Sequence, residues 1–348
     1  MSLIDGRYKP KGAPSDGGMG SVLRCEDTFL KRDVAIKFMN PGGERRRVMD
    51  EIKALETVRS PHVVQLYDVV ILPPHNQVGI VQEFIDGDDL QERAARGITE
   101  DEALHCLYQL ACGLSDTHAA GVIHRDIKPN NMKIDREGVL KLFDFGLART
   151  NGQAQTLGFR GTPGFAAPEL VTSGYVAFTT AVDVYAYGAT ALWLVARCLP
   201  DHMQGLPPAT KGDEFAALGL HPELTSCFQR CISMSPLARP PSQEVRTLLH
   251  KHLARNKHRA LVSYAGTTYR LAAGVKPFTL RRSGSPDRIR IAYDEFDFVV
   301  VDVSGDVFVN NMRVLLGMKI TGSCLITLGS GRDRAFVTFD VSHPEVVL

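Results

Sequence analysis

The segment VIHRDIKPNN, residues 122–131, places a carboxylate, an ammonium group and a carboxamide close together after a short apolar run. Asp126 can accept or orient the proton of a hydroxyl group, and Lys128 can neutralise charge on a group in transfer. Asn131 offers an oxygen to a hard cation, and such cations prefer oxygen ligands. These side chains are suited to the transfer of a charged group to a hydroxyl.

Two further segments carry residues suited to the same chemistry. Asp144 lies in FDFG after an expected strand, so Asp144 and Asn131 together can hold Mg²⁺ that bridges polyphosphate oxygens. Lys37 lies in the β-branched run KRDVAIKFM, where a lysine either extends into solvent or points at a phosphate. Glu51, on the following helical segment, can pair with Lys37 and fix its ammonium group. Each residue alone is more often structural, but the full set in this order is not expected by chance.

A glycine-rich turn, SDGGMGSV, spans residues 15–22 between two expected strands. Because glycine has no Cβ, its backbone amides can approach phosphate oxygens closely. Alone this signal is weak, since glycine-rich hairpin turns without a ligand are common.

The elements that must position these residues follow from the hydrophobic pattern. Residues 6–59 are strand-rich and glycine-rich, with one helical segment. Thr99 and Glu102 form a capping-box signature for a helix that ends at Gly121. Residues 168–257 are largely helical, the basic segment HLARNKHRA predicts a linker, and short β-rich runs follow. The fold class is therefore α+β, with a second, all-β domain.

Composition sets limits on the function. The 348 residues are 44% hydrophobic and 23% charged, which is typical of a soluble globular chain of about two domains. The net charge of +1 predicts no general attraction to nucleic acid or to anionic membranes. Seven scattered cysteines indicate a reducing compartment, and the N-terminus lacks the apolar core of a signal peptide. The apolar run from Ala181 contains Asp183 and Arg197, so it predicts a buried helix, and we expect a cytoplasmic protein.

Over residues 8–255 the motifs resemble those of eukaryotic-type (Hanks-type) Ser/Thr protein kinases. VAIK contains Lys37, HRDIKPNN contains Asp126, and DFG contains Asp144. GTPGFAAPE resembles the end of the activation segment, and DVYAYG resembles the buried helix that follows, with Asp183 as its anchor.

Two features extend the resemblance. Arg239 in SPLARP resembles the arginine that pairs with the glutamate of the Ala-Pro-Glu motif, here Glu169. Lys128, two residues after Asp126, and Thr162 in GTPGF indicate specificity for serine and threonine rather than tyrosine.

The resemblance implies that ATP and Mg²⁺ are the cofactors. Lys37, held by Glu51, would contact the α- and β-phosphates. Asn131 and Asp144 would be the metal ligands. Adenine would bond to backbone groups of QEFID. The implied nucleotide-binding set is Gly17, Gly20, Val22, Ala35, Lys37, Glu51, Gln82, Glu83, Ile85 and Asp144, with adenine at Glu83 and Ile85 and with Gln82 at the gatekeeper position.

The resemblance also implies a catalytic set. Asp126 would orient the acceptor hydroxyl, Lys128 would stabilise charge on the γ-phosphate, and Asn131 would complete the site. The expected reaction is transfer of the γ-phosphate of ATP to hydroxyls of protein substrates.

The sequence departs from the family pattern around the adenine. Ser15 stands where the family has its first loop glycine, and Pro14 before it cannot donate to a sheet ladder, so a short or irregular strand is expected there. Lys133 stands where an apolar residue usually lies under the adenine ring. Its alkyl stem can pack there while its ammonium group extends away, or it can impair binding.

The activation segment contains two candidate phosphorylation sites, Thr150 and Thr156. Arg125 and Arg149 are the arginines that could receive the phosphate. The alternative is that both threonines are ordinary exposed loop residues.

The C-terminal β-rich region more faintly resembles a forkhead-associated (FHA) domain. PFTLRRS resembles its opening strand with the phosphate-binding arginine, here Arg282, and Asn310 lies in a segment that resembles its distal half. The Ser-x-x-His element of the family is absent, and Gly305 and Asp306 replace its Asn-Gly pair. A degenerate scaffold for docking or regulation is favoured over a phosphothreonine reader, because most of the charged phosphate site is missing.

The predicted architecture is a bilobal protein kinase fold followed by a small FHA-like β-sandwich. The kinase domain covers residues 1–255, with lobes at about 8–85 and 86–255. A linker at 256–272 leads to the sandwich at 273–348.

Three functions are consistent with these residues. The first is a Ser/Thr protein kinase with a partner protein at the β domain and with no nucleic-acid partner and no membrane span. The second is a pseudokinase or scaffold that binds nucleotide or proteins without efficient transfer, which Ser15 and Lys133 keep open. A small-molecule kinase is disfavoured by GTPGFAAPE, which in the resembling family supports a peptide platform.

Overall fold

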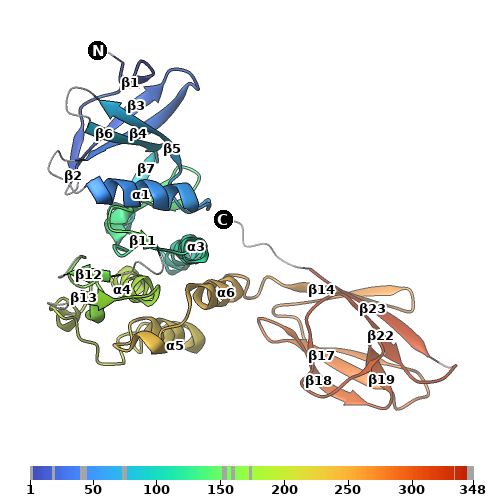
Figure 1. Ribbon diagram of the computed structural model, residues 1–348. Helices are drawn as coiled ribbons and strands as arrows, with labels where there is room; N and C mark the ends of the chain where they lie inside the picture. Colours follow the sequence, from blue (N-terminus) through green and yellow to red (C-terminus); the bar gives the residue numbers. More distant parts are fainter. Residues whose placement is uncertain are drawn as a thin grey trace. The chain divides into compact units, whose positions relative to one another are not determined.

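The computed structural model describes residues 3–17, 20–39, 45–72, 77–150, 155–157, 161–171, 175–332 and 334–342. The chain folds as two compact units, Met1–Leu249 and His250–Val347, which Figure 1 shows in the colours of the sequence. The division lies inside helix α6 (Ser242–Leu253), slightly before residue 255, where the sequence analysis placed the boundary.

The first unit begins with a six-stranded antiparallel sheet in the order β1-β3-β4-β6-β5, with β2 paired to β3. Its strands are β1 (Tyr8–Pro10), β2 (Ser15–Gly17), β3 (Gly20–Asp27), β4 (Arg32–Met39), β5 (Leu66–Leu72) and β6 (Gln77–Glu83). The glycine-rich segment forms a hairpin in which Gly17 is opposite Gly20. Pro14 interrupts the strand before it, since β1 and β2 are separate and short, as the sequence predicted. Helix α1 (Arg45–Thr57) follows β4.

The register of this sheet sorts its side chains onto two faces. Lys37 is opposite Val22 on β3, and Ala35 is opposite Gln82 on β6. Paired residues point to the same side and alternate residues share a face, so these four side chains lie on one face. The other face is a hydrophobic core that includes Leu23, Cys25, Val34, Ile36, Phe38, Val70 and Val81.

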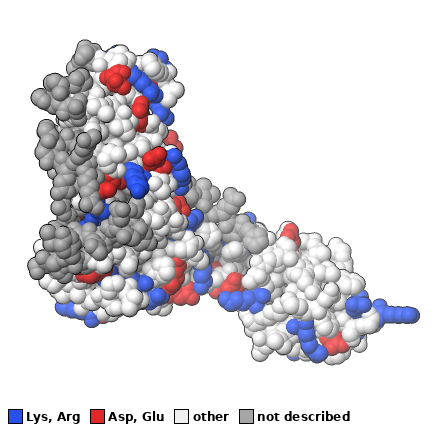
Figure 2. Space-filling view, viewed as in Figure 1, with Lys and Arg blue, Asp and Glu red and all other residues white. Residues whose placement is uncertain are grey.

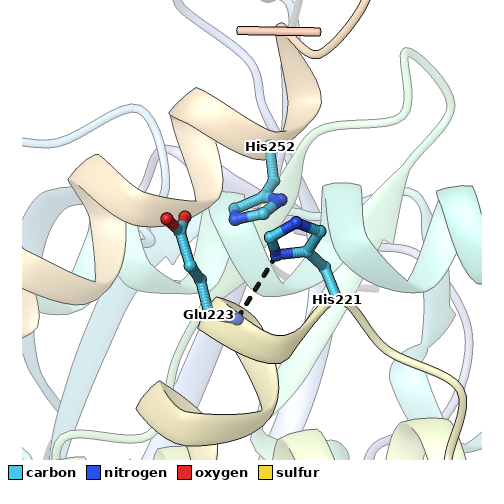
Figure 3. Close-up of side chains that lie close together, drawn as sticks. All are labelled: His221, Glu223 and His252. Atoms are coloured by element: carbon cyan, nitrogen blue, oxygen red, sulfur yellow. Dashed lines mark hydrogen bonds between the residues drawn. The ribbon is translucent and has the colours of Figure 1, made fainter. Parts of the chain in front are cut away.

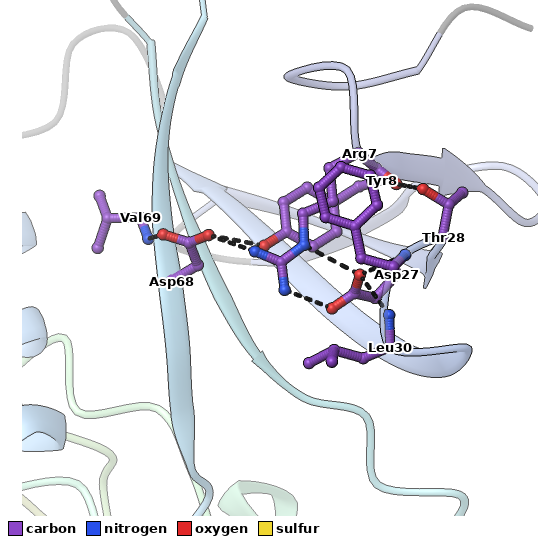
Figure 4. A network of polar contacts seen from close by, with 8 residues as sticks. Arg7, Tyr8, Asp27, Thr28, Leu30, Asp68 and Val69 are labelled. Carbon is purple, nitrogen blue, oxygen red and sulfur yellow. Dashed lines mark hydrogen bonds and ion pairs between the residues drawn. The ribbon is translucent and has the colours of Figure 1, made fainter.

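A polar network ties the start of the chain to this sheet (Figure 4). Arg7 donates from Nε and Nη2 to the carboxylate of Asp27, at 2.9 and 2.7 Å. Arg7 also reaches Asp68 at 3.2 Å, and the hydroxyl of Tyr8 donates to Asp68 at 2.8 Å. The bonds from Arg7 outweigh burial and lower the pKa of Asp27 to about 2. Asp27 also accepts the backbone N–H of Leu30, so the same carboxylate fixes the turn after β3.

Helices dominate the remainder of the first unit. They are α2 (Leu90–Ala95), α3 (Glu100–Ala119), α4 (Ala181–Ala196), α5 (Pro222–Cys231) and α6. The predicted capping box is confirmed, because Thr99 Oγ1 accepts the backbone N–H of Glu102 and the Glu102 carboxylate accepts that of Thr99. Short strands and 3₁₀ turns connect the helices: β7 (Gly87–Asp89), β8 (Val122–Ile123), η1 (Pro129–Asn131), β9 (Met132–Asp135), β10 (Leu140–Leu142), β11 (Arg149–Thr150), β12 (Gln155–Leu157), η2 (Pro168–Leu170), β13 (Tyr175–Ala177), η3 (Asp201–Met203) and η4 (Pro236–Ala238).

Helix α4 is the buried helix that the sequence predicted, with most of its side chains inside the protein. Gly188 lets α5 come close, because a Cβ at this position would lie 2.7 Å from the Cβ of Cys231. At the start of α5, Nδ1 of His221 accepts the backbone N–H of Glu223 at 3.3 Å and caps the helix (Figure 3). Among the described residues, no helix has both the length and the apolar character needed to cross a bilayer.

The second unit is all-β, as predicted, and consists of two antiparallel sheets. One has the order β15-β14-β23-β22-β19-β20 and the other the order β16-β17-β18-β21. Their strands are β14 (Arg259–Tyr264), β15 (Thr267–Ala272), β16 (Phe278–Arg281), β17 (Arg288–Tyr293), β18 (Phe298–Ser304), β19 (Val307–Val309), β20 (Met312–Arg313), β21 (Lys319–Ile320), β22 (Cys324–Leu328) and β23 (Ala335–Val341). Buried residues from both sheets, such as Val262, Ile291, Phe298 and Phe339, form one core.

The sequence analysis predicted a linker at residues 256–272, and the structure corrects this prediction. Most of this segment forms β14 and β15, which pair along their whole length. Basic residues near its start suggested a linker, but Ala260, Val262 and Leu271 point into the core of the second unit. In a short strand the few inward residues decide the fold, and the exposed Arg259 and Arg270 next to them hide that alternation.

Charge on the surface is mixed. Figure 2 shows Lys and Arg side chains interspersed with Asp and Glu on the face in view. This agrees with the net charge of +1.

His62 is a buried histidine between α1 and β5. Its Nδ1 lies 3.1 Å from the carbonyl oxygen of Leu140, so this nitrogen carries the proton and donates it. Within the described ranges its Nε2 has no hydrogen-bond partner. Burial lowers the pKa of His62, because a second proton would place a charge in an apolar interior.

We predict that the first unit loses stability as the pH falls below about 6.5, the ordinary pKa of histidine. His62 is protonated in the unfolded chain at a higher pH than in the folded protein, so acid favours unfolding. Thermal unfolding at about pH 7.5 and about pH 5.5 measures the effect, and His62→Gln should reduce the difference between the two Tm values. The matched control is His105→Gln, at a half-buried histidine on α3. An equal difference in wild type and His62→Gln would show that His62 does not contribute.

Candidate active site

Lys37 is the centre of an ionic cluster that joins three parts of the first unit. Its Nζ lies 2.8 and 3.0 Å from the two carboxylate oxygens of Glu51 on α1. The same atom lies 2.7 Å from Oδ1 of Asp144, in the loop after β10. Lys37 is 6% exposed and Glu51 is fully buried. The ion pair between Lys37 and Glu51 that the sequence predicted is therefore present, and Asp144 joins it.

The charges of Lys37 and Asp144 sustain each other. Burial disfavours the ammonium form of Lys37, but Glu51 and Asp144 outweigh burial and raise the pKa of Lys37. Burial likewise opposes ionisation of Asp144, but the ammonium group of Lys37 outweighs it, so the pKa of Asp144 lies below its usual value. Lys37 and Asp144 are thus a charged pair at neutral pH.

Asp126 lies in a second cluster, between β8 and η1. Asn131 Nδ2 donates to the Asp126 carboxylate at 2.9 Å and to its backbone carbonyl at 2.8 Å. The Nζ of Lys128 is 2.9 Å from the Asp126 carboxylate and donates to Thr162 Oγ1, also at 2.9 Å. The hydroxyl of Thr162 in turn donates to Asp126 Oδ1 at 3.0 Å. The catalytic set expected from the sequence is therefore in mutual contact.

Asp183 on α4 positions this loop. Its buried carboxylate accepts the backbone N–H groups of His124 and Arg125, at 2.8 and 2.7 Å. Burial opposes its ionisation, but the hydrogen bond from His118 and the nearby histidines keep the pKa of Asp183 low. Arg125 has φ 71° and Asp144 has φ 65°, so both backbones lie in the left-handed region. This conformation costs a residue with a Cβ about 1–3 kcal/mol of conformational free energy. The bonds from Asp183 hold the loop in that conformation.

The two clusters contain the oxygen atoms that a magnesium ion would need. Asn131 directs its carboxamide nitrogen to Asp126, which leaves its Oδ1 for a cation. Asp144 contacts Lys37 through Oδ1 and also carries Oδ2. Carboxylate and amide oxygens suit a hard divalent ion, so the residues present fit Mg²⁺.

The residues expected around adenine lie on the sheet and on the segment after β6. Val22, Ala35 and Gln82 share the face of Lys37. Glu83 is held by Lys141, whose Nζ lies 2.7 Å from its carboxylate. Ile85 is buried.

Lys133 lies on β9, half-buried, in register with Asp89 on β7 and with Lys141 on β10. It therefore belongs to the three-stranded sheet of β7, β9 and β10, and its packing against adenine stays a prediction. Gly17 and Gly20 close the hairpin of β2 and β3, and the two residues between them lie outside the described residues.

The activation segment is described in part. Thr150 and Thr156 belong to β11 and β12, but their side chains lie outside the described residues. Arg149 donates to Asp50 on α1 at 2.8 Å. Arg125 stacks over the ring of Phe178 at 4.4 Å. Both arginines expected to receive a phosphate are thus in contact with other groups.

The end of the activation segment is tied to the helical core. Arg239 donates to both carboxylate oxygens of Glu169, at 2.6 and 2.9 Å, and to the carbonyl of Ala181 at 2.9 Å. The pairing of Arg239 with Glu169 expected from the resemblance is therefore present.

Sequence reasoning missed two contacts of the site. It used Thr162 only as an indicator of substrate class, whereas the structure places its hydroxyl between Asp126 and Lys128. It also missed the ion pair of Lys141 with Glu83. The segment GTPGF singled out Thr162, but no sequence signal indicated which residue its hydroxyl would contact.

Comparisons with known proteins agree with this geometry. The family model described as protein kinase domain matches residues 15–262. The chain is 32% identical to the putative CBL-interacting protein kinase 13 of Oryza sativa subsp. japonica over 260 residues, which are 70% of this chain and 50% of that protein. It is 35% identical to serine/threonine-protein kinases PknA of Corynebacterium glutamicum over 210 residues, which are 56% of this chain and 44% of that protein.

The chain spans about half the length of the curated relatives it matches. The matched region contains Lys37, Glu51, Asp126, Asn131 and Asp144, and in the structure these residues form the two clusters of the site. The chain belongs to the protein kinase family.

Proposed function

We propose that the chain transfers the γ-phosphoryl group of ATP to serine and threonine hydroxyls of proteins. The observation that carries this proposal is the bonding of Asp126, which is held by Asn131, Lys128 and Thr162 while Lys37 is held by Glu51. A site arranged for positioning and charge stabilisation is what phosphoryl transfer requires.

On this basis we assign a role to each residue. Lys37, fixed by Glu51, binds the α- and β-phosphates and holds the nucleotide in place. The oxygen of the substrate hydroxyl forms a bond to the γ-phosphorus, and Asp126 accepts the proton of that hydroxyl. The bond between the γ-phosphorus and the β,γ-bridging oxygen breaks, so that ADP leaves. Lys128 stabilises negative charge on the phosphoryl group in transfer. Bound Mg²⁺, held by Asn131 and Asp144, would neutralise charge on the phosphate oxygens.

The scaffold alternative has less support. A protein that only binds partners does not require Asp126 to be held by three side chains or Asp144 to be ionised beside Lys37. Pro14 shortens the strand before the glycine hairpin, but Gly17 and Gly20 are still paired.

For the second unit we propose a degenerate FHA-like module that docks a partner protein or stabilises the chain. Its arrangement as two sheets around one core is compatible with that family. Arg282, the residue that would bind phosphate, donates to Asp287 at 3.0 Å. Asp287 also accepts the hydroxyl of Ser285 and the backbone N–H of Asp306. The arginine that the resemblance would make the phosphate ligand is thus already paired with a carboxylate of its own unit.

The kinase proposal predicts that the purified chain phosphorylates a generic basic protein on serine or threonine in the presence of MgATP. Asp126→Asn should lower kcat by about 10²-fold or more, since it removes the proton acceptor. Mass spectrometry of the substrate locates the phosphates. Asp201→Asn, at an exposed aspartate, is the matched control. Equal activity in wild type and Asp126→Asn would contradict the assignment, and no activity with intact ATP binding would favour the scaffold.

The contacts of Thr162 predict a difference between two substitutions. Thr162→Ser keeps the hydroxyl between Asp126 and Lys128 and should retain most of the activity. Thr162→Val preserves the shape but removes both hydrogen bonds, so kcat should fall about tenfold while the KM for ATP changes little. Steady-state kinetics with a peptide substrate measures both values. The same kcat in the two variants would mean that the hydroxyl has no part in catalysis.

The state of Arg282 predicts that the full chain does not bind phosphothreonine peptides more tightly than their unphosphorylated forms. Asp287 neutralises the arginine, so no charge-assisted phosphate site remains. Fluorescence anisotropy with a degenerate phosphothreonine peptide library measures the difference. Phosphate-dependent binding that disappears in Arg282→Ala would overturn the scaffold proposal.

A further inference from the structure

We propose that strand β15 is a dimer interface, at which the sheet edge of one chain pairs with the same edge of a second copy. The inference rests on the docking role proposed for the second unit, for which it names the partner. It does not depend on the phosphoryl transfer proposed for the first unit.

Strand β15 is the longest open edge of the second unit. Among the described residues its two sheets end in four edge strands, β15 and β20 in one sheet and β16 and β21 in the other. β20 and β21 have two residues each and β16 has four, whereas β15 has six. Natural proteins protect edge strands by keeping them short or by adding a bulge or a proline. β15 has none of these features, since it pairs with β14 in unbroken register and contains no proline.

The hydrogen bonds of β14 fix the direction of the backbone groups of β15. The carbonyl of Arg259 accepts the N–H of the residue after β23 at 2.8 Å, so Arg259 directs its backbone groups to that side. Directions alternate along an antiparallel strand, so Ala260 is bonded to its partner on β15, Leu271. The backbone groups of Arg270, and those of Thr268 two residues earlier, therefore point away from β14.

Four backbone groups are thus available at this edge, the N–H and C=O groups of Thr268 and Arg270. Both residues are exposed, and in the described part of the chain β15 pairs with β14 alone. The carbonyl of Ala272 faces the same side, but it already accepts the N–H of Val275 at 3.1 Å. A strand from another chain can pair with such groups and continue the sheet.

Two copies of β15 can use all four groups in one antiparallel register. In this register Thr268 of each copy is opposite Arg270 of the other, and the twofold axis passes between the two Tyr269 residues. Each pair of Thr268 with Arg270 exchanges two hydrogen bonds, so the two copies form four. A shift in one direction would set Arg270 opposite itself, where like charges repel. A shift in the other direction would set it opposite Gly266, in the turn of the hairpin.

The side chain of Tyr269 suits this register. Tyr269 is opposite the buried Val262, so it lies on the inner face of the sheet, where its ring is 4.7 Å from that of Phe278. The ring is at the edge, and the residue is 42% exposed. Residues that are opposite each other without hydrogen bonds approach most closely, so the two Tyr269 rings would cover each other. Aromatic cross-strand pairs of this kind stabilise sheets.

The experiment measures the mass of the full chain by sedimentation velocity over a range of concentrations. Wild type should pass from monomer to dimer as its concentration rises. Arg270→Pro removes two of the four hydrogen bonds, because the N–H of this residue is lost in both copies. Proline is tolerated on an edge strand where the N–H faces solvent, so the pairing with β14 should remain. The dissociation constant of the dimer should rise about tenfold or more.

Two control variants separate the backbone group from other effects. Arg270→Lys keeps both the N–H and the charge, and it should dimerise as wild type does. Thr279→Pro is the matched proline control, on the edge strand β16. The N–H of Arg282 donates to the carbonyl of Asp287 at 3.1 Å, so by alternation the N–H of Thr279 also points away from β17. This variant should likewise dimerise as wild type does.

Hydrogen exchange locates the interface without any substitution. In wild type, the amides of Thr268 and Arg270 should exchange more slowly at concentrations that form the dimer than after dilution. The amides of β16 should exchange at the same rate in both conditions.

Three outcomes would overturn the inference. They are a wild type that stays monomeric at every concentration, a dimer that Arg270→Pro does not weaken, and a dimer in which exchange of the β15 amides is unchanged. Asp126→Asn should dimerise as wild type does. A failure of dimerisation therefore leaves the kinase proposal standing, and a failure of phosphoryl transfer leaves the dimer interface standing.

Discussion

The buried ammonium group of Lys37 is the constraint on which the active site depends. Lys37 is only 6% exposed, so its charge needs carboxylate partners. These are Glu51 on α1 and Asp144 in the loop after β10. Removing one partner of a buried ion pair typically costs about 3–5 kcal/mol, so the three segments are held together as long as Lys37 is charged. The position of α1 and the ionisation of Asp144 are therefore consequences of one interaction. A phosphate group brought to this site would meet a cation that is already fixed.

Asp183 plays the corresponding part for the catalytic loop, although it touches no reacting group. Its carboxylate is fully buried and accepts two successive backbone N–H groups, at His124 and Arg125. Those bonds stabilise the left-handed conformation of Arg125, and the ring of His124 packs edge-on against Phe145 at 4.5 Å. Phe145 directly follows Asp144 in the chain. The loop that carries Asp126 and the loop that carries Asp144 thus share one anchor in the helical core.

The sequence was sufficient to predict the residues of the site but not all of their contacts. Lys37, Asp126 and Asp144 could be named because each lies in a short motif, and Glu51 because it lies on the helical segment after the strand of Lys37. The contact of Thr162 with Asp126 joins segments far apart in the chain, and nothing in the local pattern specifies it. The prediction of a linker at residues 256–272 failed for a related reason. Few residues, chiefly Ala260, Val262 and Leu271, mark β14 and β15 as core strands, and the pairing of β14 with β23 is visible only in three dimensions.

Lys37 and Arg282 show why a cation near acidic groups does not by itself indicate function. Arg282 is bonded to Asp287, which also accepts from Ser285 and Asp306, so the charge of this arginine is balanced by a carboxylate of its own unit. The cluster of Lys37 instead includes Asp144, whose charge is maintained by Lys37 against burial. Asn131 directs its carboxamide nitrogen to Asp126, so its Oδ1 points to another side. A buried charge that is held in place beside further oxygen atoms is suited to receive a charged ligand. This contrast supports the proposal that phosphoryl transfer takes place in the first unit.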